Sequence, residues 1–373
     1  MQYARLGNTG LQVSRLGFGA MRLLQKEEGS YDLDATVEIM RHAFDLGLNF
    51  VDSQYHYCGD QSEPCVGKAI AGRRDRVVVQ TKACYYDKPA YKPGETHRSR
   101  LEETLERLGT DYLDVYLMHS LRMDRWQELG DAWMRMALKA RDEGLIRHIG
   151  LSTHDTPENV KKHIDTGHFE AILMQYNLLD QRYEDCFAYA REKGLGTMVM
   201  GPVGGGRLAG PSEELRSAAP EGVRTSADLA LRFVLSNPNV DCALSGMRSI
   251  AEVEENCAVA ANRTPLTQEE RDRIEAALKE KNRLSELYCS GCNYCLPCPN
   301  GVAISHIFKA MALKKVWGLT DAARGSYARL GDESRIGKPA SACQECGECE
   351  PKCPQDIPIR ERLKEAREAL EES

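Results

Sequence analysis

The stretch Tyr112-Leu-Asp-Val-Tyr-Leu-Met118 is a short apolar run rich in β-branched and aromatic residues, and His119 follows it directly. A run of this length and composition predicts a buried β-strand. Further runs of the same kind bring the total to eight; they lie at residues 13–19, 49–52, 77–81, 146–151, 171–175, 197–200 and 240–244.

Helical patterns lie between these runs. Apolar residues recur at spacings of three and four at residues 33–46, 97–108, 126–143, 157–166, 183–193 and 226–235. Alternating strands and helices predict a parallel sheet. Eight such units in about 250 residues favour a closed (β/α)8 TIM barrel in the α/β class. A doubly wound open sheet is the alternative, although no strand-linked G-x-G-x-x-G motif supports it.

Polar side chains follow five successive predicted strands: Asp52 with Tyr57 just beyond it, Lys82, His119, Ser152 and Gln175. In a barrel these positions share the C-terminal mouth, where barrel enzymes carry their active sites. Taken alone, His119 could equally be a structural residue. Asp52 and Lys82 could likewise form a buried ion pair with no catalytic role. Their occurrence at successive strand ends favours a catalytic group.

Asp52, Tyr57, Lys82 and His119 fit acid catalysis on a carbonyl group. Tyrosine ordinarily titrates near pH 10, about three units above neutral pH. A neighbouring Lys82 ammonium would lower the pKa of Tyr57, and Asp52 would keep Lys82 charged and in place. As a hydrogen-bond donor, His119 would orient the carbonyl oxygen and stabilise its developing negative charge.

At these residues the chain resembles the aldo-keto reductase family. The matching segments include Asn49-Phe-Val-Asp-Ser53, Gln80-Thr-Lys82, Asp111-Tyr-Leu-Asp-Val-Tyr-Leu-Met-His119, Gln175-Tyr-Asn177 and Glu254-Glu-Asn256, and they cover nearly the whole predicted barrel. The resemblance implies an NAD(P)H-dependent oxidoreductase that reduces an aldehyde, ketone or sugar. It implies a tetrad of Asp52, Tyr57, Lys82 and His119 with Tyr57 as proton donor, since the nearby Tyr55 lacks the family's spacing from Asp52.

The resemblance also implies a nicotinamide site at the ends of the later strands. Its residues would be Ser152, Gln175, Met200, Gly201, Val203, Gly205, Arg207, Gly246, Arg248, Glu255 and Asn256. Met200 stands where many relatives stack an aromatic ring, and Thr153 replaces a common asparagine. Recognition of the nicotinamide amide would therefore rest mainly on Ser152 and Gln175.

Two features bear on the phosphates of the cofactor. The glycines of residues 201–207 would let backbone N–H groups approach an anion. Glu252 stands where relatives that prefer NADP usually have an arginine, which favours NAD, whereas the neighbouring Arg248 favours NADP. The sequence leaves NAD and NADP as alternatives.

Eight of the fourteen cysteines form two blocks, Cys289-x2-Cys292-x2-Cys295-x2-Cys298-Pro299 and Cys343-x2-Cys346-x2-Cys349-x3-Cys353-Pro354. This spacing is typical of [4Fe-4S] ligands. Structural zinc is the alternative, but zinc sites usually show two separate CxxC pairs. In two-cluster ferredoxins the cysteine before the proline serves the other cluster. By that analogy one cluster takes Cys289, Cys292, Cys295 and Cys353, and the other takes Cys343, Cys346, Cys349 and Cys298.

The predicted domain boundary follows the helical pattern of residues 268–281. It gives a reductase barrel at 1–283 and a small, mainly helical, ferredoxin-like domain with two clusters at 284–373. The cysteine blocks resemble those of the bacterial branch of the family that carries such a domain, and the helical stretch at 307–317 resembles helical ferredoxin modules. A domain this small gains much of its folding free energy from its clusters. The other cysteines are interpreted as buried small hydrophobic residues: Cys58, Cys65, Cys84, Cys186, Cys242 and Cys257.

Composition limits the other classes of function. The formal net charge of -7 argues against a nucleic-acid partner, and no apolar run reaches the length of a membrane span. The cysteine pattern without a signal peptide predicts a cytoplasmic protein. A small-molecule carbonyl compound is the expected partner, with a redox protein as a further one. Two alternatives to a reductase are electron transfer between nicotinamide and the clusters, which would need a flavin-like mediator, and a non-catalytic nicotinamide sensor.

Overall fold

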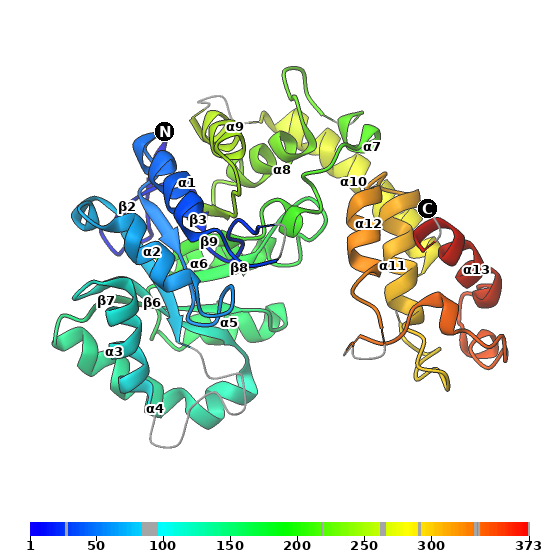
Figure 1. Ribbon diagram of the computed structural model, residues 1–373, viewed down its shortest axis with the longest axis horizontal. Helices are drawn as coiled ribbons and strands as arrows, with labels where there is room; N and C mark the ends of the chain where they lie inside the picture. Colours follow the sequence, from blue (N-terminus) through cyan, green and yellow to red (C-terminus); the bar gives the residue numbers. More distant parts are fainter. Residues whose placement is uncertain are drawn as a thin grey trace. The chain divides into compact units, whose positions relative to one another are not determined.

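The computed structural model describes residues 1–26, 29–83, 96–217, 219–261, 266–289, 292–331, 334 and 336–371. The chain divides into two compact units (Figure 1). The first comprises Met1–Gly205 and Ala230–Pro265, and the second comprises Gly206–Leu229 and Leu266–Ser373.

Eight parallel strands close a barrel in the first unit. They are β3 (Leu16–Gly19), β4 (Phe50–Asp52), β5 (Val78–Ala83), β6 (Leu113–Leu121), β7 (Ile146–Thr153), β8 (Ala171–Gln175), β9 (Gly196–Met200) and β10 (Cys242–Ser245). Each strand pairs with the next along the chain, and β10 pairs with β3 to complete the closure. The structure confirms the TIM barrel, and the open sheet is excluded.

Helices connect the barrel strands. They are α1 (Leu33–Asp45), α2 (Ser62–Ile70), α3 (His97–Leu108), α4 (Met123–Asp142), α5 (Pro157–Asp165), α6 (Glu184–Glu192), α8 (Ser226–Leu235) and α9 (Ile250–Ala261). Side chains at Asp32, Thr96 and Thr156 cap the backbone N–H groups at the starts of α1, α3 and α5. The predicted helices are confirmed, but the periodicity did not predict α9 or α2, and the nine residues of α2 include a proline and a glycine.

An antiparallel hairpin of β1 (Tyr3–Arg5) and β2 (Gln12–Ser14) precedes the barrel. The predicted strand at 13–19 is therefore wrong at its start, because Val13 belongs to this hairpin and the barrel strand begins at Leu16. Leu6 packs so closely on Gly196 that a Cβ there would lie 2.5 Å from Leu6 Cγ. The hairpin thus covers the start of β9, and the opposite, C-terminal ends of the strands remain for a site.

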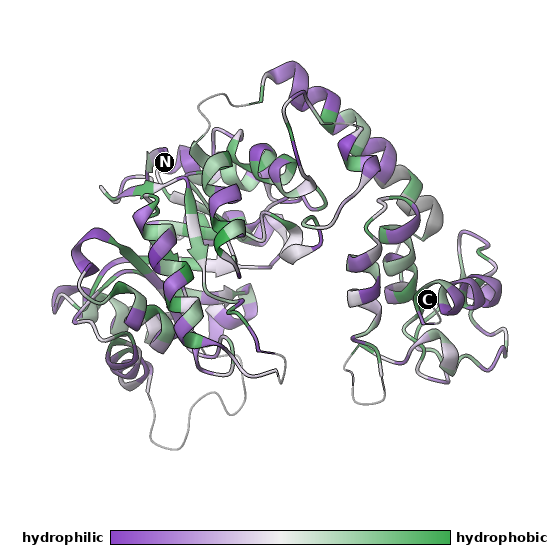
Figure 2. Cartoon of the chain, turned by 45° about the horizontal axis from the view of Figure 1, so that its top comes forward, coloured by the Kyte–Doolittle hydropathy of each residue, from purple (hydrophilic) through white to green (hydrophobic). Residues whose placement is uncertain are grey.

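Hydrophobic side chains fill the barrel interior. One buried cluster joins the hairpin to residues of five barrel strands: Leu6, Val13, Phe50, Val115, Leu117, Ala171, Leu173, Met198, Cys242 and Leu244. Figure 2 shows the hydrophobic colour concentrated on the strands, while α10 (Gln268–Tyr288) is largely hydrophilic. No helix in the described ranges has the length and apolar character to cross a bilayer.

The second unit is mainly helical. Besides α10 it contains α7 (Glu213–Arg216), α11 (Ile304–Lys315), α12 (Thr320–Tyr327) and α13 (Ile359–Leu370). Its core is built mostly from α11 and α13: Val302, Ile304, Ile307, Phe308, Ala310, Met311, Ala323, Tyr327, Ala340, Ile357, Ile359, Leu363, Ala366 and Leu370. The predicted helical C-terminal region is confirmed, with α11 beginning three residues earlier than the pattern indicated.

The segment after β9 packs with these C-terminal helices. The buried Ser212 hydroxyl donates a hydrogen bond of 2.7 Å to the carbonyl of Trp317 and accepts one of 3.1 Å from the N–H of Leu215. Lys281 Nζ donates to the neighbouring carbonyl of Val316 at 3.0 Å. Part of the second unit therefore comes from a connection between two barrel strands, and the boundary at residue 283 stays a prediction.

Candidate functional site

Lys82 is held as a buried cation at the mouth. Its Nζ lies 2.6 and 2.7 Å from the two carboxylate oxygens of Asp52 and 2.8 Å from the carbonyl oxygen of Ser53. Burial alone would lower the pKa of Lys82, but Asp52 and Tyr57 outweigh it and the pKa is raised. Lys82 is therefore an ammonium at neutral pH.

Tyr57 lies beside this ammonium. Lys82 Nζ is 4.8 Å from the centroid of the Tyr57 ring, and the ring centroids of Tyr57 and His119 are 6.2 Å apart. Burial raises the pKa of Tyr57, and the opposing effect of Lys82 is smaller. The predicted effect of Lys82 has the right sign, but the expected net lowering is wrong because burial dominates.

His119 reaches the mouth from an irregular strand end. The register of β6 on β7 shifts between Met118 and Leu121, and Ser120 has a φ of +49°. Such bulges redirect side chains. Burial, followed by the charge of Lys82, lowers the pKa of His119 to about 3. The imidazole is consequently neutral at physiological pH, and its remaining N–H can donate a hydrogen bond to a carbonyl oxygen.

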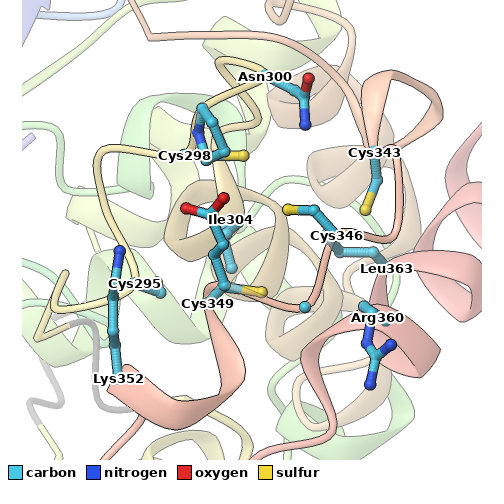
Figure 3. Close-up of a pocket in the computed structure, with 13 residues that line it drawn as sticks. Cys295, Cys298, Asn300, Ile304, Cys343, Cys346, Cys349, Lys352, Arg360 and Leu363 are labelled. Atoms are coloured by element: carbon cyan, nitrogen blue, oxygen red, sulfur yellow. The ribbon is translucent and has the colours of Figure 1, made fainter.

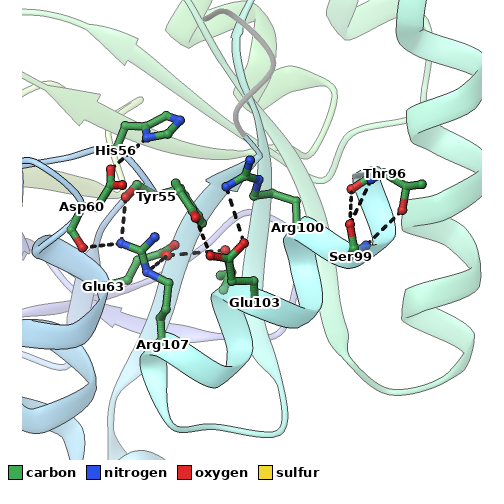
Figure 4. A network of polar contacts seen from close by, with 10 residues as sticks. Tyr55, His56, Asp60, Glu63, Thr96, Ser99, Arg100, Glu103 and Arg107 are labelled. Carbon is green, nitrogen blue, oxygen red and sulfur yellow. Dashed lines mark hydrogen bonds and ion pairs between the residues drawn. The ribbon is translucent and has the colours of Figure 1, made fainter. Parts of the chain in front are cut away.

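Tyr55, the other tyrosine considered as proton donor, takes part in a separate network of hydrogen bonds and ion pairs (Figure 4). Its ring lies between two guanidinium groups, with Arg100 Cζ at 4.0 Å and Arg107 Cζ at 3.9 Å from the centroid. Its hydroxyl donates to Glu103 at 2.5 Å, and burial raises its pKa. These contacts leave Tyr57, rather than Tyr55, beside Lys82.

The same network fixes the loop that carries Tyr57. Arg107 donates to the carbonyl of Tyr55 at 3.0 Å and to the carbonyl of Asp60, on either side of Tyr57. The buried Glu63 lies 3.4 Å from Arg107 and accepts from Thr81, one residue before Lys82. Glu63 belongs to a segment that carries the family resemblance, whereas nothing in the sequence indicated Arg107.

The predicted nicotinamide residues lie at neighbouring strand ends. The Ser152 hydroxyl accepts from the N–H of Ser120 at 2.8 Å, and Gln175 Nε2 donates to Asp180 at 3.1 Å. Thr153 uses its hydroxyl to bond the carbonyl of Leu121 at 2.7 Å. All three side chains are hydrogen-bonded within the protein, and recognition of the nicotinamide amide mainly by Ser152 and Gln175 stays a prediction.

The loop after β9 has the backbone shape of an anion site. Gly201, Gly204 and Gly205 have φ values of +64°, +59° and +67°, a region that favours glycine. Asn177, absent from the predicted cofactor set but part of the family segment, holds this loop by donating to the carbonyl of Gly201 at 2.9 Å. Successive amides in such a turn form a concavity for phosphate oxygens. Met200 precedes these glycines, Val203 lies between Gly201 and Gly204, and Arg207 is the second residue of the second unit, which begins at Gly206.

The loop after β10 supplies the remaining cofactor candidates. Glu252 accepts from the N–H of Arg248 at 2.7 Å, so that its carboxylate lies at the start of α9. Asn256 Nδ2 donates to Ser245 at 3.2 Å, at the end of β10, and Glu255 precedes Asn256 in the helix. Gly246 follows Ser245 directly. The carboxylate of Glu252 therefore lies at the N-terminus of α9, where the helix dipole would otherwise stabilise a bound phosphate.

The eight block cysteines gather around two pockets in the second unit. A pocket of about 350 Å³ is lined by Cys298, Cys343, Cys346 and Cys349, together with Cys295 (Figure 3). A second of about 320 Å³ is lined by Cys289, Cys292, Cys295 and Cys353. Ile304 lines both. When Cys295, which lines both pockets, is counted with the second, each pocket has three cysteines of one block and the last cysteine of the other, a donor set that fits a [4Fe-4S] cluster.

These thiols surround hollow space and do not converge on a point. Within the described ranges, no three Cys, His, Asp or Glu side chains lie close enough to hold a single metal ion. Among the other cysteines, Cys65, Cys186, Cys242 and Cys257 are buried as predicted, and Cys58 is half-buried. Cys84 lies outside the described residues.

Comparison with known proteins agrees with both units. Residues 15–279 match the aldo/keto reductase family, and residues 288–357 match a 4Fe-4S dicluster domain. The chain belongs to the aldo/keto reductase family and is an oxidoreductase of that family with an appended 4Fe-4S domain.

Similar proteins cover the barrel. L-galactose dehydrogenase of Arabidopsis thaliana is 32% identical over 304 residues, which are 75% of this chain and 95% of that protein. The NADH-specific methylglyoxal reductase of Escherichia coli is 26% identical over 69% of this chain and 93% of its own length. The holo structure of an aldo-keto reductase from Bacillus halodurans is 30% identical, with a TM-score of 0.64 over 74% of this chain and 96% of that chain.

Proposed function

We propose that this protein reduces a small-molecule carbonyl compound with NAD(P)H and that Tyr57 donates the proton. The observation that carries the proposal is the position of the Lys82 ammonium, bound by both oxygens of Asp52 and 4.8 Å from the centre of the Tyr57 ring. A buried cation at this distance stabilises the phenolate that proton donation leaves behind.

The other tetrad groups have complementary roles. Because burial raises the pKa of Tyr57, its phenol stays protonated at neutral pH and ready to act as an acid. The neutral His119 imidazole donates a hydrogen bond to the carbonyl oxygen and places it near Tyr57. A bound reduced nicotinamide supplies the hydride, and Ser152 and Gln175 are proposed to hold its amide.

Turnover by anaerobically prepared protein tests this proposal. The substrate panel should contain aldehydes, ketones and sugars, with L-galactose and methylglyoxal included because two relatives are named for them. We expect substrate-dependent oxidation of NADH or NADPH by the wild-type protein and none by Tyr57→Phe. Tight nicotinamide binding without turnover of any panel member would instead favour the sensor.

The proposed cofactor is NADH in preference to NADPH. The carboxylate of Glu252, bound to the N–H of Arg248, places negative charge where the 2′-phosphate of NADPH would approach. Glu252→Gln should improve NADPH binding about three- to tenfold and leave NADH binding within twofold, as measured by fluorescence titration. The exposed Glu254, which pairs with His42, provides a matched control as Glu254→Gln. Equal effects of both substitutions on NADPH would contradict the assignment.

We also propose that the second unit holds two [4Fe-4S] clusters with crossed ligands. The support is the division of the thiols between the two pockets, three from one block and one from the other. Anaerobically purified protein should contain about eight iron and eight sulfide per chain. Stoichiometric zinc without sulfide would refute this cofactor proposal and leave the carbonyl reduction untouched.

A further inference from the structure

The loop between β4 and α2 contains three consecutive residues with left-handed backbone conformation. Cys58, Gly59 and Asp60 have φ values of +56°, +58° and +67°, and they follow Tyr57 directly. Only glycine enters this region without a steric penalty, so that Cys58 and Asp60 hold a conformation that other residues rarely adopt. A strained segment of this kind persists only where the surrounding contacts enforce it.

Arg107 on α3 provides such contacts (Figure 4). Its Nη2 donates to the carbonyl oxygen of Tyr55 at 3.0 Å and also to the carbonyl oxygen of Asp60. The first carbonyl precedes Tyr57 and the second belongs to the last of the left-handed residues. One guanidinium therefore joins the two ends of the segment that contains the proposed proton donor and the strained backbone.

The guanidinium of Arg107 is itself held in place. Its Nε lies 3.4 Å from the buried carboxyl group of Glu63, and its Cζ lies 3.9 Å from the centroid of the Tyr55 ring. The helix that carries it packs closely on α2, because a Cβ at Gly67 would lie 2.7 Å from the carbonyl oxygen of Leu108. The packing of α2 and α3 therefore sets the position from which Arg107 reaches the loop.

We infer that Arg107 is a positioning residue for Tyr57: it holds the left-handed segment in place and so sets the position of the phenol hydroxyl beside Lys82. This inference rests on the proposed function, in which Tyr57 donates the proton. Lys82 does not depend on Arg107, since its ammonium is bound by Asp52 and Ser53. A displacement of about 1 Å between reacting groups can lower a rate about a hundredfold.

The test measures kcat for carbonyl reduction and the dissociation constant of NADH with the full-length protein. Arg107→Met keeps an apolar stem and removes the N–H donors. It should lower kcat about thirtyfold to a hundredfold and leave the dissociation constant of NADH within about twofold, because only the proton donor is displaced. Arg107→Lys should recover part of kcat. Arg98→Met removes another guanidinium of α3, one that pairs with Glu102, and should leave both quantities within about twofold.

Substitution of Asp60 separates positioning from general stability. Asp60→Gly and Asp60→Ala both keep the carbonyl that Arg107 binds, and both remove the carboxylate that pairs with His56. They differ in that only glycine adopts the left-handed conformation without penalty. In the Arg107→Met background, Asp60→Gly should therefore give a kcat about fivefold or more above that of Asp60→Ala.

Thermal unfolding shows whether each variant is folded, and Arg107→Lys carries the same comparison if Arg107→Met does not fold. A fall in kcat at constant NADH affinity, with recovery specific to glycine, supports the inference. A fall in kcat below about fivefold, an equal loss of NADH affinity, or equal recovery with alanine overturns it while the proposed function stands. A wild-type protein that reduces no carbonyl compound, or an active Tyr57→Phe, refutes the proposed function itself.

Discussion

The barrel mouth and the cysteine pockets differ in how their functional groups are held. At the mouth, Lys82 is bound by Asp52 and Ser53, and Arg107 holds the backbone on both sides of Tyr57. In the second unit, five cysteines line one pocket and four line the other, with Cys295 common to both.

This difference separates a preorganised site from one that its cofactor completes. Contacts within the protein already fix the charges and hydrogen bonds that the proposed chemistry needs at the mouth. The core of the second unit includes partly buried cysteines packed against α11 and α13, so that cluster binding and folding are coupled there. The barrel should therefore stay folded without bound nicotinamide, whereas the second unit should unfold when its clusters are removed.

The largest expected effect is that of Tyr57→Phe at the preorganised site. Removing the proton donor should lower kcat for carbonyl reduction on the order of a thousandfold or more. Nicotinamide binding should change little, because the ring and its surroundings remain. Stopped-flow oxidation of NADH and equilibrium titration measure the two quantities.

Tyr55→Phe is the matched control for this change. It removes a hydroxyl that donates to Glu103 and keeps the ring between Arg100 and Arg107. Its kcat should stay within tenfold of the wild type. An inactive Tyr55→Phe beside an active Tyr57→Phe would reverse the assignment of the proton donor.

Removal of the clusters should unfold the second unit selectively. Oxidation and chelation of iron should increase amide hydrogen exchange in α11 and α13 by about a hundredfold or more, because cluster binding supplies folding free energy there. Exchange in β5, β6 and β7 should remain slow. If the amides of α11 and α13 exchanged equally slowly with and without iron, their hydrophobic core would be sufficient to keep them folded.

Paired cysteine substitutions test the crossed ligand sets. Cys298→Ala with Cys346→Ala alters one pocket and should leave about four iron per chain. Cys292→Ala with Cys298→Ala alters both pockets and should leave almost none. If each block held its own cluster, the first pair of substitutions would leave almost no iron, and the second pair would leave about four iron per chain.

The smallest expected effect concerns the pH dependence of barrel stability. Burial raises the pKa of Glu63 to about 7, despite the opposing effects of Thr81 and Arg107. The folded state therefore binds this proton more tightly than the unfolded state does. The contribution of Glu63 to the free energy of unfolding consequently falls as pH rises from about 4.5 to about 7.

Glu63→Gln removes this titration. The difference in Tm between pH 5 and pH 8 should shrink by about 2–4 °C in the variant, as measured by calorimetry. Glu102→Gln on the exposed side of α3 is the control and should leave the difference unchanged. A larger pH dependence in Glu63→Gln would show that the ion pair with Arg107 dominates.

Most of the fold could be predicted from the sequence because the barrel strands are short apolar runs that alternate with helical patterns. The β1–β2 hairpin was not predicted, since no glycine or proline separates Val13 from Leu16. Asp52, Lys82 and His119 could be proposed from their positions at strand ends, whereas the choice of Tyr57 over Tyr55 rested on the family resemblance. The contacts of Arg107 could not, because they depend on how α3 packs, and the raised pKa of Tyr57 could not, because it depends on burial.

The contact between Ser212 and Trp317 bears on how the protein can be dissected. A deletion after Lys281 would remove the carbonyl of Trp317, to which the buried Ser212 hydroxyl donates. If such a fragment were inactive, the cause could be either the loss of iron or the loss of the contacts that support the segment after the glycine loop. The second unit contains residues 206–229 as well as the C-terminal region, so that it cannot be removed by cutting the chain at one point. Substitutions of single cysteines therefore test the role of the clusters more specifically than a truncation does.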